Sequence, residues 1–297
     1  MLPDDWHLAD DGHWHLTEDV DDFLARAGDF LRSRAALHNT PLTDIEKLRL
    51  RRASGRDTEG ADVFGRLDAA GEARAVFYLT ARGRLGLTPL PTRQVGRLAA
   101  QLTGLGLSPA HVIADHDTAT AFAEAWQRHT AAAPVPFWKT HLYRLGTLTP
   151  PRPLPAGRGH LADDKDRDQV VRWCREFCVA VGETASIEAI DAGSWAESRF
   201  GDRHFTFWEA PDATPVSMAA TTSMLGGMVR VDPVYTPAPL RGHGYAGAVT
   251  AEVSRAALTA GARDVVLFTD PANPTSNALY QRLGYVRIAG FAGYRFS

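Results

Sequence analysis

One stretch, residues 228–246 with the sequence MVRVDPVYTPAPLRGHGYA, constrains the fold of this 297-residue chain more than any other. Its valines predict a buried strand, and two prolines end that strand because proline cannot continue a ladder of hydrogen bonds. Gly242 and Gly244 then permit backbone conformations that a Cβ forbids. Apolar residues follow at helical spacing from Tyr245 onward, and Gly261 suits the end of that helix. The stretch therefore predicts a strand, a loop and a helix.

The beginning of this helix is predicted to bind an anion. Unpaired N–H groups of the first turn face the glycine loop, beside the positive end of the helix dipole and the Arg241 guanidinium. Such donors suit a phosphate or a diphosphate. The spacing is Arg241-x-x-Gly244-x-Ala246, and neither of the two commonest phosphate-loop patterns occurs. The alternative is a glycine turn that only joins a strand to a helix.

A second motif lies downstream. Residues 264–270 form an almost continuous apolar run, which is typical of a strand covered on both faces. In the segment NPTSNALYQRLGY that follows, Asn273 suits the N-cap, Pro274 the first helical position and Gly284 the C-cap. We expect a short helix with Tyr280 in its last turns.

The two motifs together resemble those of the GNAT N-acetyltransferase superfamily. The first resembles the acyl-CoA loop Arg/Gln-x-x-Gly-x-Gly/Ala. The second resembles Asn-x-x-Ala-x-x-x-Tyr-x-x-x-Gly-Phe/Tyr, with Ser276 where alanine is usual and the same spacing of seven between Asn273 and Tyr280. The resemblance implies an α/β (α+β) fold in which helices flank a mixed, mostly antiparallel sheet.

Length and composition predict a soluble protein of two domains. The chain is longer than a usual single domain, and 44% of its residues are hydrophobic and 23% charged. No apolar run is long enough for a membrane span, and the acidic start is unlike a signal peptide, so we expect a cytoplasmic protein. A net charge of −3 offers nucleic acid no overall attraction. Cys174 and Cys178 fit a helical packing pattern, and we expect no metal site.

A proline- and glycine-rich segment without periodicity, GTLTPPRPLPAGRG, predicts an interdomain linker. We place the domains at 1–146 and 159–297, with 147–158 between them. The first half is predicted to hold helices at 17–34 (with Thr17 as N-cap), 42–51, 93–102 and 118–129, and strands at 61–67, 73–79, 85–90, 110–114 and 137–145. The second half is predicted to begin with a strand near His160, helices at 166–181 and 187–200, and strands at 204–209 and 216–222.

The two halves also resemble each other. Thr88-Pro-Leu-Pro-Thr-Arg-Gln-Val-Gly lines up with Thr236-Pro-Ala-Pro-Leu-Arg-Gly-His-Gly at an offset of 148 residues, about half the chain length. Shorter matches follow in order, among them Trp126-Gln-Arg with Tyr280-Gln-Arg. The chain is therefore predicted to hold two GNAT-like domains in tandem.

The first half departs from the motifs where the chemistry needs them. Gln94 and Leu98 stand where the phosphate loop has Gly242 and Ala246, and Trp126 replaces the tyrosine. Side chains then crowd the loop where backbone meets phosphate, and an indole has no hydroxyl to give a proton. We predict a degenerate copy that binds no acyl-CoA and supplies interface and part of the acceptor pocket.

For the second half, the resemblance implies that backbone groups of residues 234–236 pair with the pantetheine and that the glycine loop holds the diphosphate. His243 is expected to line the diphosphate. Asn273 and Asn277 are expected along the pantetheine arm, with the N-cap as an alternative or additional role for Asn273. The full set of expected acetyl-CoA contacts is Val234, Tyr235, Thr236, Arg241, Gly242, His243, Gly244, Tyr245, Ala246, Asn273 and Asn277.

Two catalytic residues are predicted. An amine with a pKa near ~10.4 is neutral in only about one molecule in a few thousand at pH 7, so a base must take its proton. Asp232 is the predicted base, with Glu209 as a competitor and an exposed bulge carboxylate as the alternative for Asp232. Tyr280 matches the tyrosine that many superfamily members use as general acid toward the thiolate, and its alternative role is core packing.

The resemblance thus implies transfer of an acetyl group from acetyl-CoA to a primary amine of an unidentified, small-molecule acceptor by direct attack, without a metal or a membrane partner. Two alternatives stay open. A GNAT-fold transferase that takes aminoacyl-tRNA as donor is disfavoured by the intact loop and the acidic net charge. A non-catalytic CoA sensor is disfavoured by the retention of Tyr280.

Overall fold

The computed structural model describes residues 13–53, 60–191 and 203–297. The chain divides into two compact units, one of Met1–Leu142 with Ile288–Ser297 and one of Tyr143–Arg287. These units differ from the two sequence halves in two respects. The second unit already begins at Tyr143, within the first half. The last residues of the chain, from Ile288 onward, belong to the first unit.

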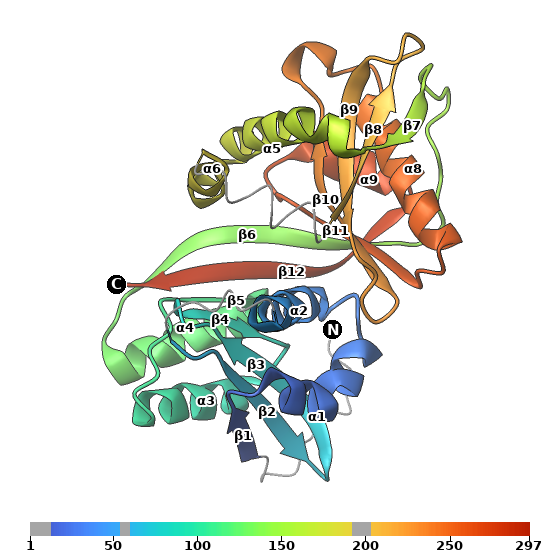
Figure 1. Cartoon of the computed structure of the whole chain (residues 1–297). Helices are drawn as coiled ribbons and strands as arrows, with labels where there is room; N and C mark the ends of the chain where they lie inside the picture. The colour runs from blue at the N-terminus through green and yellow to red at the C-terminus, as the bar shows by residue number, and fades with distance from the viewer. Residues whose placement is uncertain (1–12, 54–59, 192–202) are drawn as a thin grey trace. The chain divides into compact units, whose positions relative to one another are not determined.

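Both halves of the chain have the same order of elements within the described residues: a strand, two helices, three strands, a helix, a strand, a helix and a strand (Figure 1). The first half consists of β1 (His13–Thr17), α1 (Val20–Ser33), α2 (Asn39–Ala53), β2 (Val63–Ala69), β3 (Glu72–Leu79), β4 (Arg84–Leu87), α3 (Thr92–Gly104), β5 (His111–Asp115), α4 (His116–Thr130) and β6 (Pro134–Leu145). The second half consists of β7 (Arg158–Leu161), α5 (Arg167–Val181), α6 (Thr184–Asp191), β8 (Arg203–Glu209), β9 (Pro215–Thr222), β10 (Met228–Tyr235), α8 (Tyr245–Thr259), β11 (Asp264–Thr269), α9 (Pro274–Arg282) and β12 (Tyr285–Phe296). The repeated order agrees with the internal repeat in the sequence.

Each unit contains a mixed, mostly antiparallel sheet, which confirms the predicted fold class. In the first unit β1 to β4 pair antiparallel in order, β4 is parallel to β5, and β5 pairs antiparallel with Phe291–Arg295 of β12. In the second unit β7 to β10 pair antiparallel in order and β10 is parallel to β11. Each parallel pair is joined by one crossover helix, α3 or α8, as parallel strands require.

The strands carry apolar side chains on both faces, so each sheet is covered by helices on both sides. In the second unit Phe207 belongs to the core shared with α5, whereas its neighbour Trp208 belongs to the core shared with α8 and α9. Figure 1 shows α5 and α8 on opposite sides of β8 and β9. Cys174 and Cys178 are not joined in a disulfide and are buried in the α5 core, as the helical pattern predicted.

Most predicted boundaries differ from the structure by up to three residues, and two of these differences have a clear local cause. The N-cap of α1 is Asp19, whose carboxylate accepts from the N–H groups of Asp21 and Asp22. Thr17 was the wrong choice because it is still paired in β1, opposite Phe64. The strand predicted at 85–90 ends at Leu87, before Pro89. The helix predicted at 187–200 corresponds to α6, and its part beyond residue 191 lies outside the described residues. None of the described helices has the length and hydropathy of a membrane span.

Candidate functional site

The central strand of the second unit, β10, carries a bulge near its C-terminal end. Val231 lies opposite Thr221 of β9, and Val234 lies opposite Ala219, so β10 has one residue more than β9 over this interval. On its other side, the parallel ladder with β11 ends at Val231, opposite Leu267. In the described ladders, the last residues of β10 are thus paired with β9 and not with β11, which leaves one backbone edge of the strand available for another extended group.

The segment that follows β10 forms an exposed glycine loop. A short 3₁₀ turn, Ala238–Leu240, leads to Arg241, and the next residues are solvent-exposed up to the beginning of α8. Gly242 and Gly244 both have left-handed backbone conformations, with φ of +83° and +82°. Gly244 is the N-cap of α8 and offers no side chain to its first turn. The predicted arrangement of loop and uncapped helix is therefore present.

Two side chains of the loop are tied to its own backbone. The Nε of Arg241 donates to the Thr236 carbonyl oxygen across 3.1 Å. The Nδ1 of His243 lies 3.0 Å from the Arg241 carbonyl oxygen, and its ring stacks on Tyr245 with 5.7 Å between centroids. A neutral His243 that donates from Nδ1 keeps Nε2 as an acceptor. These bonds give the guanidinium a definite position at the start of the loop and the imidazole one between its two glycines.

The C-terminal end of β10 is held by hydrogen bonds to α5 and to β9. The Tyr235 hydroxyl donates to Glu176 of α5 across 2.7 Å, and burial together with this bond raises the pKa of Tyr235 to about 12. The Ser217 hydroxyl donates to the Tyr235 carbonyl oxygen and lies 2.8 Å from Oγ1 of Thr236. Tyr235 therefore has only its backbone to offer to a ligand along the free edge of β10.

Tyr280 lies in α9 and is 8% exposed. Its ring packs edge-on against Tyr285, with 6.0 Å between centroids. Burial raises the pKa of Tyr280 above the ordinary tyrosine value, and the neighbouring Tyr285 and the charge of Asp232 raise it further. The hydroxyl therefore keeps its proton at neutral pH. Tyr280 packs in one core cluster with Val231 and Val234, which lie on either side of Asp232 in β10, so the structure brings the two predicted catalytic residues into one region.

Asp232 has a partner that the sequence did not indicate. Its Oδ2 lies 3.0 Å from Nη2 of Arg203, whose Nη1 also donates to the Asp232 carbonyl oxygen. The Arg203 side chain is 4% exposed and that of Asp232 is 43% exposed. Arg203 is the first residue of β8, and only the pairing of β8 with β9 and of β9 with β10 brings it to the bulge.

Glu209, the competing base, lies elsewhere. It is the last residue of β8, six residues after Arg203, which corresponds to about 20 Å along a strand. Its carboxylate pairs with Arg158 across 3.2 Å. Asp232 and Glu209 are therefore too far apart along the sheet to serve the same reacting atom.

The two asparagines of the second motif stabilise the turn between β11 and α9. Asn273 accepts from the Ser276 N–H across 3.0 Å, which confirms the predicted N-cap. The Nδ2 of Asn277 donates to the carbonyl oxygens of Asp270 and Asn273, and its Oδ1 accepts from the Tyr143 hydroxyl across 3.1 Å. The side chain of Asn277 is thus engaged within the protein, and Tyr143 is a second residue that sequence reasoning missed.

The corresponding segment of the first unit has a different structure. Helix α3 begins at Thr92, so the residues that line up with the phosphate loop are already helical. The N–H groups of Gln94 and Val95 donate to the Pro91 carbonyl oxygen across 2.9 and 3.1 Å. The side chains of Gln94 and Leu98 are buried. Arg97 and Leu98, which line up with Tyr245 and Ala246, lie beyond the first turn of α3, where helical N–H groups donate to the carbonyl oxygen four residues earlier.

In the comparison with known proteins, the family match falls in the second half of the chain. Residues 218–295 match the family model described as FR47-like protein, which is a GNAT-type domain. A GCN5-related N-acetyltransferase from Sphaerobacter thermophilus is 19% identical, with 97% of this chain and 96% of that chain covered and a TM-score of 0.55. A tandem GNAT protein from the clavulanic acid biosynthesis pathway is 10% identical, with 95% and 98% covered and a TM-score of 0.55. This chain has the tandem GNAT fold.

A GCN5-related N-acetyltransferase from Kribbella flavida is 18% identical to this GNAT-fold protein, over 75% of this chain and 86% of that chain, with a TM-score of 0.52. No curated protein sequence matches the chain significantly. The FR47-like match extends from β9 into β12 and so includes the bulge, the glycine loop and Tyr280. In the part of the chain that the structure describes, no cluster of three histidine, cysteine or acidic side chains could hold a metal ion.

Proposed function

We propose that this GNAT protein is an N-acetyltransferase that moves an acetyl group from acetyl-CoA to the primary amine of a small molecule. The observation that carries the proposal is the junction of β10 and α8. A bulged strand with one unpaired edge leads into an exposed glycine loop and an uncapped helix. A buried, protonated Tyr280 lies in α9 of the same unit.

The residues of this junction fit acetyl-CoA. A Cβ placed on Gly242 would meet no atom within 4 Å, so the space above the loop is open to a diphosphate. The N–H groups of Tyr245 and Ala246 in the first turn of α8, with the Arg241 guanidinium beside them, supply its donors. The backbone of Val234–Thr236 offers the amide and carbonyl groups that an extended pantetheine pairs with.

Bound acetyl-CoA supplies an activated acyl group and a thiolate leaving group. The hydroxyl of Tyr280 holds a proton at neutral pH, and we assign it as the acid. The half-exposed Asp232 carboxylate attracts the cationic amine and accepts its proton, directly or through water. Arg203 fixes the orientation of this carboxylate through its bonds to the side chain and the carbonyl oxygen of Asp232.

Calorimetric titration of acetyl-CoA into the whole chain tests the proposal. A panel of primary amines is then incubated with the protein and acetyl-CoA and analysed by mass spectrometry. We expect binding and an acetylated amine. Absence of binding would contradict the proposal and would make aminoacyl-tRNA the next donor to test. Binding without acetylation of any amine in the panel would favour the CoA sensor instead.

A further inference from the structure

Tyr143, near the end of β6, is buried in the second unit although it belongs to the first half of the sequence. It packs in the same core cluster as Tyr280. Its hydroxyl donates to Oδ1 of Asn277 across 3.1 Å and accepts from Nε2 of Gln281 across 3.4 Å. Asn277 and Gln281 lie one turn apart on the same side of α9. One buried hydroxyl therefore joins two consecutive turns of this helix.

Tyr280 lies between these two residues in α9, directly before Gln281. The helix has only nine residues, Pro274–Arg282, and isolated helices shorter than about 12 residues are marginal in water. The position of α9 therefore depends on its contacts with the rest of the unit. An acid that gives up its proton during a reaction needs a defined position, because a displacement of about 1 Å can cost roughly 100-fold in rate.

The chain that leaves β6 holds the C-terminal end of the same helix. The N–H of Gly146 donates to the Gly284 carbonyl oxygen across 2.9 Å, and that of Thr149 donates to the Leu283 carbonyl oxygen across 3.0 Å. Gly284 has a φ of +95°, and a Cβ at this position would overlap the Thr147 carbonyl oxygen. Only glycine lets the two segments approach so closely. The side and the end of α9 are thus both held by residues 143–149.

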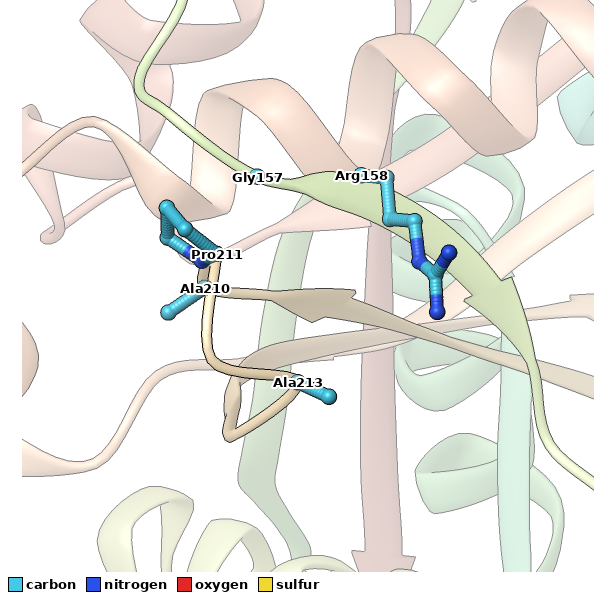
Figure 2. A pocket seen from close by; sticks show the side chains of 5 residues that line it. All are labelled: Gly157, Arg158, Ala210, Pro211 and Ala213. Carbon is cyan, nitrogen blue, oxygen red and sulfur yellow. The ribbon is translucent and has the colours of Figure 1, made fainter.

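The same segment then passes the beginning of α8 on its way to β7. The Cγ of Pro151 lies 3.2 Å from the position that a Cβ on Gly247 would take, inside α8. Figure 2 shows Gly157 at the end of this path, where the chain leads into β7. The chain between β6 and β7 therefore contacts both helices of the candidate site, and Tyr143 is its fixed point on α9.

The first unit contains an equivalent contact. Tyr294 of β12 lines up with Tyr143 in the internal repeat, since arginine follows both. The Tyr294 hydroxyl lies 3.1 Å from Oγ1 of Thr120 in α4, within the first unit. In each unit, a tyrosine from the last strand of the other half is thus bonded to the last helix. Of the two helices, α9 alone contains a tyrosine of its own, because α4 has Trp126 at that position.

We propose that Tyr143 is a positioning residue for acetyl transfer, which fixes α9 and with it the direction of the Tyr280 hydroxyl. The inference rests on the proposed function. Tyr143 acts through its bonds to Asn277 and Gln281 and needs no contact with a substrate. A residue of the first half of the sequence then contributes to the catalysis of the second unit, which explains why its tyrosine is buried there.

A double-mutant cycle tests the inference in the whole chain. Tyr143→Phe keeps the ring in the core and removes the hydroxyl. We expect its kcat to fall about tenfold with an unchanged KM for acetyl-CoA, because the glycine loop keeps its structure. In Tyr280→Phe the acid is already absent, so adding Tyr143→Phe should lower kcat no further. Tyr294→Phe is the matched control, which removes the equivalent bond from the first unit and should change kcat in neither background.

Urea unfolding of the same variants separates positioning from stability. A merely structural role of Tyr143 would lower the urea midpoint and leave the kcat of the folded protein unchanged. That result, an equal fall in kcat in both backgrounds, or the same fall in Tyr294→Phe would overturn the inference while the proposed function stands. Full activity in Tyr280→Phe would remove the acid and the inference with it. If the wild-type protein acetylates no amine, the proposed function and the inference both fail.

Discussion

Arg203 and Asp232 join the first residue of β8 to the bulge of β10 through an ion pair of 3.0 Å and a second bond to the main chain. The arginine is buried and the carboxylate is half-exposed. The pair thus fixes the backbone of the bulge and the direction of its carboxylate at once. Asp232 in turn acts on the Tyr280 hydroxyl, so Arg203 influences both proposed catalytic groups without contacting a substrate.

Replacing Arg203 should therefore impair catalysis more than nucleotide binding. We expect Arg203→Gln to lower kcat/KM for the amine by about tenfold or more and to reduce stability by about 1–3 kcal/mol, because the bulge loses a buried charged partner. Arg203→Lys should restore part of the activity. Steady-state kinetics and urea unfolding measure both effects. Arg175→Gln, which removes an exposed pair with Asp191, is the control and should change neither.

Removing one hydroxyl should separate chemistry from binding. Tyr280→Phe keeps the ring against Tyr285, so we expect unchanged acetyl-CoA affinity and a kcat lowered by about 100-fold. An acid works only while protonated, and burial raises the pKa of Tyr280. The alkaline limb due to this residue should thus lie above the ordinary tyrosine value of ~10. Full activity in Tyr280→Phe would show that this tyrosine serves only in core packing. Tyr294→Phe in the first unit is the matched control.

The number of acetyl-CoA molecules bound per chain should distinguish the two units. Because the N–H groups of Gln94 and Val95 are used within α3, we expect one acetyl-CoA per chain. Gly244→Glu forces a side chain onto a residue with φ of +82° and places a carboxylate at the anion site, so it should abolish binding. Gly96→Glu changes the position that lines up with it, where a Cβ meets nothing within 4 Å, and should bind normally. Two sites by calorimetry would show that the first unit is not degenerate.

Acid should destabilise the first unit through His38. Burial, followed by the nearby charge of Arg34, lowers the pKa of His38 to about 4, and its Nδ1 lies 3.1 Å from the Leu31 carbonyl oxygen. The unfolded chain takes up a proton near pH 6.5 and the folded chain near pH 4. The contribution of His38 to the free energy of unfolding is therefore constant above pH 6.5. It falls as the pH drops toward 4, by roughly 3 kcal/mol in all.

Urea midpoints at pH 7 and pH 4.5 measure this loss. His38→Gln has no imidazole to protonate, so it should show a smaller decline over the same interval. An equal decline in the variant would place the acid sensitivity in other groups.

Local sequence determined the elements of the candidate site. Gly242, Gly244 and the two prolines define a loop between a strand and a helix because φ preferences act within a few residues. Asn273 and Pro274 define the start of α9 in the same way, and the seven-residue spacing then places Tyr280 in that helix. These features need no distant partner, and the structure has each of them where the sequence indicated.

Tertiary structure decided which side chains meet at the site, because the pairing of distant strands cannot be predicted from neighbouring residues. Arg203 reaches Asp232 only through the register of three strands, and Tyr143 reaches Asn277 from 134 positions away. The same reason applies to the last strand, whose residues 288–297 belong to the first unit although they lie in the second repeat in sequence. Sequence by itself determined which loops and helix ends exist, whereas hydrogen bonding between distant strands decided which side chains meet there.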